Sequence, residues 1–377
     1  MVHSLEGLRG IAALMVALFH FKIGATIFSP IRNGYLMVDL FFVLSGFVIC
    51  AAYFGRLNST SQTAVFMVRR FGRLFPLLIF STLLFIFAHN LHAFLKSMLV
   101  MWGFGSALND PGHKYLWPAA SEVLSTLTLT HGMGLHDRLV LNPVSWSISV
   151  EFYTYIVFAL LCISLPRKSR VAAFTVVCIL AFAVSLWASA WGPHQCLLKG
   201  ACLDLTYDFG FTRCLFSFFL GTIVWRLKDQ FSHSRATVQV VSLALISALF
   251  VVVDAHPIAA FMFPFAFALL IWSMSTDSGY FAKLLATRPF QVIGARSYSI
   301  YMLHPVLGIA FAPLVSRVDG ALMACAMVTL YLLALIVLSG LTYRFVEVPA
   351  REFFNSLAKH PKKTGASSIH ARERGIE

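Results

Sequence analysis

Hydrophobic runs of about twenty residues recur along almost the whole chain, and each is long enough to cross about 30 Å of hydrocarbon as an α-helix. The runs leave no room between them for a soluble domain of ordinary size. Composition agrees, because 59% of the 377 residues are hydrophobic and only 12% are charged, which excludes an ordinary soluble protein. The sequence therefore predicts an all-α integral membrane protein, a bundle of about ten transmembrane helices.

The boundaries of the predicted spans follow from the hydrophobic runs and their flanking loops. The spans cover residues 5–23, 37–54, 71–102, 144–165, 170–191, 208–227, 237–253, 257–273, 291–315 and 321–343. The first run contains Arg9 and His20 and has neither a basic n-region nor a small-residue cleavage site, so we interpret it as a retained helix, not a signal peptide. We expect one transmembrane domain, 1–349, followed by a basic cytoplasmic tail, 350–377, that is disordered at its end.

The formal net charge of +13 comes from Lys and Arg distributed over alternating loops. This distribution is typical of membrane topology signals and not of a nucleic-acid site, and it places the N- and C-termini in the cytoplasm. The longest outer segment, 103–143, contains an apolar stretch too short to span, so we expect a re-entrant or interfacial cap. Cys196 and Cys202 fall in one outer loop, where a disulfide and two free thiols are both open.

Ionisable side chains inside a span are costly unless they are paired or hydrated, so each one is a functional candidate. Arg9 and His20 are eleven positions apart, which places them on one helix face, about 16 Å apart along the axis. This puts a cation near the cytoplasmic surface and an imidazole near the outer end. Asp39, at the outer start of the second span, is a candidate carboxylate partner for His20. The alternatives are a histidine bonded to a backbone carbonyl and an aspartate favoured by the helix dipole.

Two further spans carry isolated polar groups. Glu151 lies in the fourth span behind Trp146 and is a candidate catalytic carboxylate; the alternative is a structural partner for a buried cation such as Arg213. His304 directly precedes Pro305, which would disturb the helix and free backbone groups. His304 therefore either lines a cavity or is a structural histidine.

The cluster of Arg69, Arg70 and Arg73 precedes the third predicted span. Their guanidinium groups are suited to clamp a phosphate-bearing ligand at the cytoplasmic mouth. Ordinary positive-inside arginines have the same appearance. Ser45 is a possible nucleophile, although serine in a membrane helix often bonds its own backbone or permits close packing.

Several motifs occur together and in order. They are LEGLRGIAA at 5–13 with Arg9 ahead of His20, GYLMVDLFFVLSGF at 34–47, the arginine cluster followed by Pro76, WSISVEFY at 146–153, and YSIY at 298–301 leading to His304. With these motifs the chain resembles the acyltransferase-3 family of integral membrane acyltransferases, mostly bacterial proteins that O-acylate cell-surface polysaccharides. The resemblance covers residues 5–349.

The resemblance implies an enzyme of the bacterial inner membrane. It would take an acyl group, commonly acetyl, from cytoplasmic acyl-CoA and deliver it to a hydroxyl of a glycan or glycolipid at the other face, without a metal and without nucleic acid. The predicted site comprises catalytic His20, Asp39 and Glu151; acyl-CoA-binding Arg9, Arg69, Arg70 and Arg73; and the further cavity residues Ser45, Trp146, Arg213, Tyr301 and His304.

We expect His20, held by Asp39 or Glu151, to remove the proton of the acceptor hydroxyl as it attacks the thioester, a role worth about 10² to 10⁴ in rate. A two-step route in which His20 or another group carries the acyl fits equally well. Many relatives carry an appended extracytoplasmic hydrolase-like domain, whereas this chain ends in a short tail, so transfer would finish in the membrane domain or with a partner. The rival function, a secondary transporter of an anionic solute, predicts inverted repeats that the sequence lacks. The acceptor and the oligomeric state stay open.

Overall fold

The computed structural model describes residues 2–21, 23, 28–104, 114–230, 234–315 and 317–358. Within these residues the chain forms helices joined by turns and contains no strand. The helices are α1 (His3–Phe21), α2 (Ser29–Arg32), η1 (Gly34–Leu36), α3 (Met37–Tyr53), α4 (Thr60–Leu99), η2 (Val100–Phe104), α5 (Ala120–Leu127), α6 (Trp146–Ser164), α7 (Arg167–Ala190), α8 (Cys196–Lys199), α9 (Gly210–Leu227), α10 (Arg235–Val252), η4 (Pro257–Met262), α11 (Phe263–Met274), α12 (Tyr280–Leu285), α13 (Arg288–Ala295), α14 (Ser297–Val315), α15 (Gly320–Thr342), η5 (Tyr343–Glu347) and α16 (Val348–Leu357).

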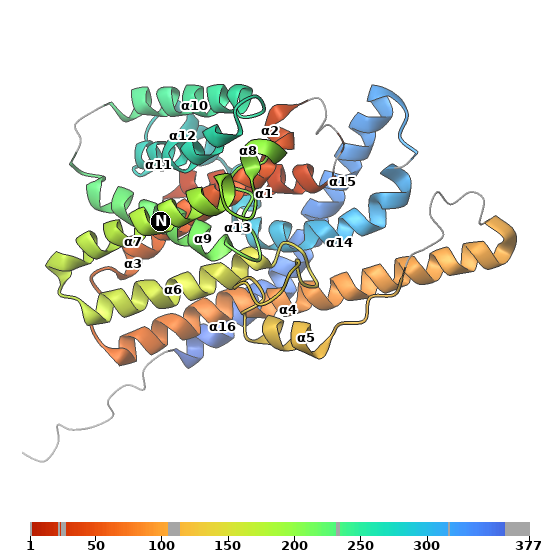
Figure 1. The fold of residues 1–377 in the computed structure, drawn as a ribbon, viewed down its shortest axis with the longest axis horizontal. Helices are drawn as coiled ribbons and strands as arrows, with labels where there is room; N and C mark the ends of the chain where they lie inside the picture. Colours follow the sequence, from red (N-terminus) through yellow and green to blue (C-terminus); the bar gives the residue numbers. More distant parts are fainter. Residues whose placement is uncertain are drawn as a thin grey trace, which may run out of the picture.

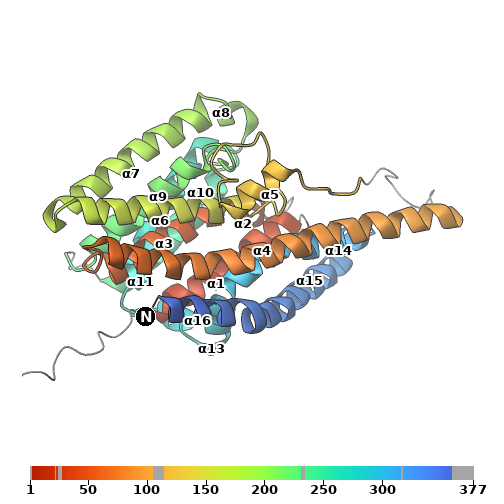
Figure 2. The same ribbon diagram turned by 90° about the horizontal axis from the view of Figure 1, so that it is seen from below.

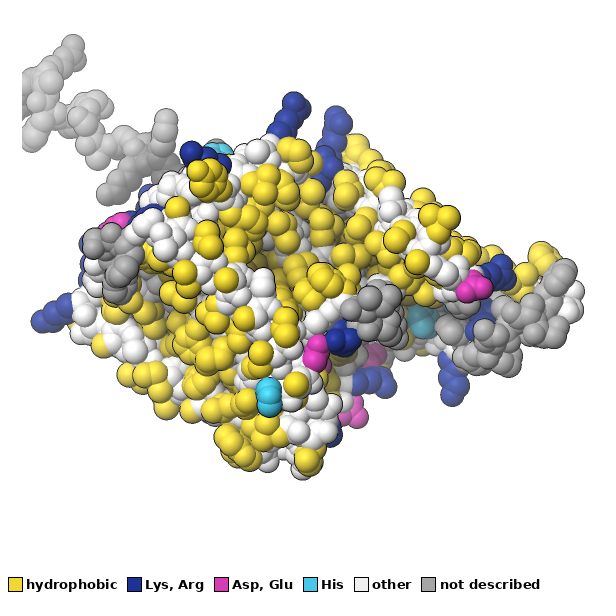
Figure 3. Space-filling model, turned by 90° about the horizontal axis from the view of Figure 1, so that it is seen from above, with side chains coloured by type: hydrophobic (Ala, Val, Ile, Leu, Met, Phe, Trp, Pro, Cys, Tyr) yellow, Lys and Arg dark blue, Asp and Glu magenta, His cyan; other side chains and the backbone are white. Residues whose placement is uncertain are grey.

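Nine helical segments within the described ranges are long and apolar enough to cross a membrane. They are His3–Phe21, Gly34–Tyr53, Thr60–Gly103, Trp146–Ser164, Arg167–Ala190, Arg235–Val252, Pro257–Met274, Ser297–Val315 and Gly320–Leu357. The remaining predicted span, 208–227, coincides with α9, a helix that carries the buried Arg213. The predicted all-α membrane bundle is confirmed, and the broad face in Figure 3 is largely hydrophobic, with Lys and Arg mainly at its margins.

Helix α9 packs against α3, α6 and α7 in the core of the bundle, with α4 and α16 together on another side (Figures 1 and 2). Helices α3 and α9 approach each other closely, and one glycine of each helix faces the partner backbone. A Cβ atom at Gly46 would overlap the carbonyl oxygen of Phe218, and one at Gly221 would overlap that of Val43. Small residues let membrane helices approach closely, so these glycines hold the central helix pair together.

Several boundaries differ from those expected. Helix α4 begins at Thr60, ahead of the predicted 71, because the Ser59 hydroxyl caps it by accepting a hydrogen bond from the backbone N–H of Gln62. The predicted span 291–315 is two helices, α13 and α14, which meet at Arg296. Residues 350–357 of the predicted tail belong to α16, which packs on α4, and the part of the tail beyond residue 358 lies outside the described residues.

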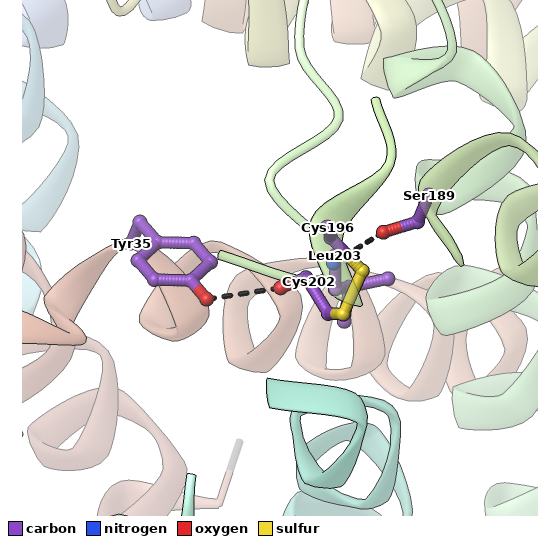
Figure 4. Close-up of a disulfide and its surroundings, with 5 residues drawn as sticks. All are labelled: Tyr35, Ser189, Cys196, Cys202 and Leu203. Atoms are coloured by element: carbon purple, nitrogen blue, oxygen red, sulfur yellow. Dashed lines mark hydrogen bonds between the residues drawn. A yellow bond between two sulfur atoms is a disulfide. The ribbon is translucent and has the colours of Figure 1, made fainter. Parts of the chain in front are cut away.

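Cys196 and Cys202 form a disulfide within the segment that connects α7 to α9 (Figure 4). Of the two alternatives left open by the sequence, the structure has the disulfide and not the two free thiols. The backbone around this disulfide is tied to the bundle. The Tyr35 hydroxyl donates to the Cys202 carbonyl at 2.9 Å, and the Leu203 N–H donates to the Ser189 hydroxyl at 2.9 Å. The predicted cap segment contains α5, a two-turn helix, and its residues 105–113 lie outside the described ranges.

Candidate active site

A partly open cavity of about 250 Å³ lies between α1, α3, α4, α6 and α14. Its wall combines apolar side chains with guanidinium, carboxylate and hydroxyl groups. The charged and hydroxyl-bearing residues in the wall are Arg9, Ser45, Arg70, Arg73, Ser147, Glu151, Tyr155, Ser297, Tyr298 and Tyr301. Because these helices are distant in sequence, only the packing of the bundle brings the groups together.

Glu151 and Ser45 meet in the cavity wall, as two of the predicted site residues. The Ser45 hydroxyl donates to Glu151 Oε1 at 2.6 Å, and the Tyr155 hydroxyl donates to the same oxygen at 2.5 Å. The two hydroxyl oxygens are 2.9 Å apart. Two hydroxyl donors compensate a carboxylate for the water that it loses on burial. The cluster therefore places a hydrogen-bonded carboxylate in the same cavity wall as the arginines.

Arg9 and Arg73 supply positive charge from two different helices. Arg9 Nη1 lies 3.7 Å from Glu6 Oε1 on the same face of α1. Arg9 and Arg73 interact electrostatically with each other, and both interact with Glu151 and Glu347. The cavity therefore holds fixed cations whose charge is balanced by carboxylates nearby, which is a favourable environment for an anionic ligand group.

The two other arginines of the predicted cluster, Arg69 and Arg70, differ in their relation to the cavity. Arg70 lines the cavity, and its guanidinium carbon lies 5.8 Å from the Tyr53 ring and 5.9 Å from the Phe66 ring, within cation–π range. Its Nε atom is buried and has no hydrogen-bond partner among the described residues. Arg69 is not among the described residues that line this cavity. The geometry thus gathers Arg9, Arg70 and Arg73 and leaves Arg69 apart from them.

Asp39 is not placed as expected, because its carboxylate binds Arg213 and not His20. Arg213 Nη2 lies 2.7 Å from Asp39 Oδ2, its Nε also donates to the carboxylate, and the Ser217 hydroxyl donates to Oδ1 at 2.9 Å. Trp146 covers this pair, with its ring 5.7 Å from the guanidinium carbon. Both charged side chains are essentially fully buried, and a buried carboxylate needs a paired cation. The alternative partnership of Glu151 with Arg213 is likewise replaced by this pair.

His20 instead meets His304. His20 Nδ1 lies 3.0 Å from the Val16 carbonyl oxygen and 3.1 Å from His304 Nε2. His20 is exposed, whereas His304 is fully buried. Tyr301 stands one turn earlier on α14, 5.8 Å from His304 between ring centroids, and its hydroxyl is 2.8 Å from that of Ser147 in the cavity wall. A chain of ring contacts therefore connects His20 to the cavity.

Glu347 is a buried carboxylate next to the site residues Arg9 and Arg73 that the sequence-based reasoning missed. It lies in the π-turn η5, is 3% exposed, and accepts a hydrogen bond from the Ser299 hydroxyl at 3.0 Å. Its charge interacts with Arg73 and Arg9. The available signal was a glutamate that directly follows the last apolar run, and a π-turn at that point is common at functional sites.

The fold and the cavity define a polytopic membrane protein with a charged internal site. The acyltransferase-3 family model, described as an acyltransferase domain, matches residues 2–344. The chain belongs to the acyltransferase-3 family. The prediction of a membrane acyltransferase is confirmed at this level. No solved structure matches the chain.

Bacterial relatives are similar to this chain over almost its whole length. BcsY of Komagataeibacter xylinus, provisionally named a membrane-bound transacylase, is 25% identical over 99% of this chain and 89% of its own length. The peptidoglycan O-acetyltransferase OatA of Listeria monocytogenes is 23% identical, over 93% of this chain and 56% of OatA. The O-acetyltransferase OatA of Staphylococcus aureus is 23% identical, over 96% of this chain and 59% of that protein. The chain thus spans little more than half the length of these two OatA proteins.

Proposed function

We propose that the chain is a membrane O-acyltransferase. It moves an acyl group, in the simplest case acetyl, from acyl-CoA at the cytoplasmic face to a hydroxyl of a cell-surface or exported glycan or glycolipid. The observation that carries this proposal is the cavity that gathers Arg9, Arg70 and Arg73, while His20 lies at the other end of the helix that bears Arg9. Family membership favours acyl transfer over solute transport, and the names of the OatA relatives favour an O-acetyl product and a glycan acceptor.

The arginines fit the donor by charge. Guanidinium groups bind phosphate oxygens through paired hydrogen bonds, and the phosphates are the anionic part of acyl-CoA. The cavity volume of about 250 Å³ lies below the roughly 300–1,000 Å³ typical of pockets that enclose a drug-sized ligand. The nucleotide of the donor would therefore remain at the mouth near the arginines, and the pantetheine arm with its thioester would enter.

Acyl transfer then requires a base. His20 accepts the proton of the acceptor hydroxyl as the hydroxyl oxygen attacks the thioester carbonyl carbon. A C–O bond forms, the C–S bond breaks, and the CoA thiolate leaves and takes up a proton. General-base assistance contributes about 10² to 10⁴ in rate. A covalent route, in which an imidazole nitrogen of His20 first takes the acyl group and then passes it to the acceptor, uses the same residues.

The membrane placement follows from charge and redox chemistry. The positive-inside pattern supports cytoplasmic N- and C-termini. A disulfide between Cys196 and Cys202 supports an oxidising environment for that end of the bundle, because disulfides persist outside the reducing cytosol. The named relatives come from bacteria, and we assign the chain to the bacterial cell membrane, which is the inner membrane in a cell that has two.

The test is transfer of label from radiolabelled acetyl-CoA into envelope glycan by membranes that contain the wild type, His20→Ala or Arg9→Ala. We expect both variants to lose labelling. Arg138→Ala, which removes a mostly exposed arginine of the outer segment, is the matched control and should label as the wild type does. Equal labelling by equally abundant wild type and His20→Ala would show that His20 is not the base.

A further inference from the structure

The contact between His20 and His304 is held by a third helix. The Tyr331 hydroxyl of α15 lies 3.2 Å from the His304 carbonyl oxygen and 3.5 Å from the Ala17 carbonyl oxygen. The Tyr331 ring also stacks on Phe21, with centroids 3.9 Å apart. One buried side chain therefore links the two helices: its ring packs on α1, and its single hydroxyl hydrogen is directed at carbonyl oxygens of α14 and α1, which favours a fixed separation of the two imidazoles.

The partners of His20 define its tautomer. A carbonyl oxygen only accepts hydrogen bonds, so His20 Nδ1, 3.0 Å from the Val16 oxygen, must carry a hydrogen. An unprotonated Nδ1 would set its lone pair against that oxygen. The same Nδ1–H faces His304 Nε2 at 3.1 Å, and a hydrogen shared between two acceptors is common near helix ends. In this tautomer of neutral His20 the basic lone pair is on Nε2.

The arrangement also defines the tautomer of His304. Because its Nε2 accepts from His20, neutral His304 carries its hydrogen on Nδ1. The imidazole lies against the backbone of Ile300 and Tyr301. Pro305 has no N–H, so the Tyr301 carbonyl four residues earlier lacks its helical hydrogen bond and offers a partial negative charge there. His304 Nδ1 has no regular hydrogen-bond partner among the described residues, and the backbone of Tyr301 and Ile300 is what faces its hydrogen.

We propose that His304 is a positioning residue that accepts from His20 Nδ1 and thereby presents His20 Nε2 as the base of acyl transfer. This inference rests on the proposed function and deepens it. The role corresponds to that of a group that orients a catalytic imidazole through its distal nitrogen. The neutral, fully buried His304 achieves this without placing a second charge beside the transferring group.

The decisive comparison is His304→Gln with His304→Asn. A Gln amide oxygen reaches the place of His304 Nε2 and can still accept from His20, whereas the shorter Asn amide stops near the place of Nδ1. We expect His304→Asn to lower the kcat of acyl transfer by about 10- to 100-fold, with the KM for acyl-CoA unchanged, and His304→Gln to keep most of the activity. In the His20→Ala background, His304→Asn should cause no further loss.

A matched control is Met302→Leu, a volume-conserving change at a buried position of the same helix, which should leave kcat unchanged. Thermal unfolding of each purified variant reports its fold. If His304→Gln and His304→Asn lower kcat equally at equal stability, His304 acts only through packing and the inference is wrong. If His20→Ala is inactive while His304→Asn keeps full kcat, the inference is wrong and the proposed function stands. An active His20→Ala overturns the proposed function itself.

Discussion

Two buried charge clusters of this protein are built in opposite ways. In the Asp39–Arg213 pair, both carboxylate oxygens and every guanidinium nitrogen have protein partners, including the carbonyls of Tyr35 and Leu205. In the cavity, the Nε atom of Arg70 is buried without a hydrogen-bond partner among the described residues. A pair saturated in this way, with a partner at every polar atom, has little left to offer a ligand, whereas a guanidinium group with an unpaired buried nitrogen can still donate to one. The difference separates charges that hold the bundle from charges that serve the site.

The largest expected effect comes from breaking the saturated pair. Asp39→Leu leaves the Arg213 charge buried without compensation and should lower the free energy of unfolding by about 3–5 kcal/mol. Thermal unfolding of the detergent-purified protein measures this. The double variant Asp39→Leu/Arg213→Met removes both charges and should recover most of the stability. A double variant that is as unstable as the single one would contradict a structural ion pair.

Removing a cavity arginine should act on binding. Arg70→Ala deletes charged hydrogen bonds to a donor phosphate worth about 1.5–3 kcal/mol, so the KM for acyl-CoA should rise by about 10- to 100-fold. The unfolding temperature should change little, because Arg70 forms no ion pair with any residue that the structure describes. Arg70→Lys keeps the charge but lacks the planar guanidinium group, so its KM for acyl-CoA should lie between those of the wild type and Arg70→Ala. An unchanged KM with a lower unfolding temperature would place Arg70 with the structural charges.

A smaller effect is expected at the hydroxyl that bonds Glu151. Ser45→Ala removes one donor of the carboxylate, a loss of about 1 kcal/mol, so the kcat should fall by about fivefold. Single-turnover transfer from acyl-CoA measures this step. Loss of all transfer from a stably folded Ser45→Ala would instead make Ser45 the carrier of the acyl group.

The exposed pair of Arg32 and Asp254 provides the smallest effect. Hydrogen bonds from Arg32, the largest contributor, and from Asn33 and Ser29 lower the pKa of Asp254 to about 2. Because the folded pKa lies below the ordinary value, the stabilisation is present at neutral pH and is lost as the pH falls toward about 2. Arg32→Ala should cost little stability at neutral pH, because solvent screens an exposed ion pair, and it should flatten the acid dependence of the unfolding temperature. An unchanged acid dependence would show that other carboxylates dominate it.

Much of the fold could be predicted from the sequence. Runs of apolar residues predicted the membrane helices, and their order in the chain was confirmed, because the cost of exposing backbone to lipid acts on each segment separately. The break between α13 and α14 at Arg296 was missed, since an apolar run continues on both sides of it. The start of α4 at Thr60 was also missed, because the cap at Ser59 precedes the apolar residues.

The sequence predicted several of the residues that form the candidate site, but it did not predict which of them contact one another. Arg9, Ser45 and Glu151 carried a signal because polar groups within apolar spans are conspicuous, and they do line one cavity. Glu347 escaped notice because it follows its apolar run and is buried by the packing of η5 against α4 and by its contact with Ser299 of α14. The partner of His20 was assigned to Asp39 or Glu151, whereas the structure supplies His304.

The sequence by itself determined the membrane class, the helical composition, the family and the side chains available for chemistry. These properties depend on hydrophobicity and on motifs that are local along the chain. Only the tertiary structure decided which charge meets which, because partners such as Asp39 and Arg213 are 174 residues apart. Electrostatic and hydrogen-bond energies depend on distances between atoms, and those distances exist only after the helices have packed.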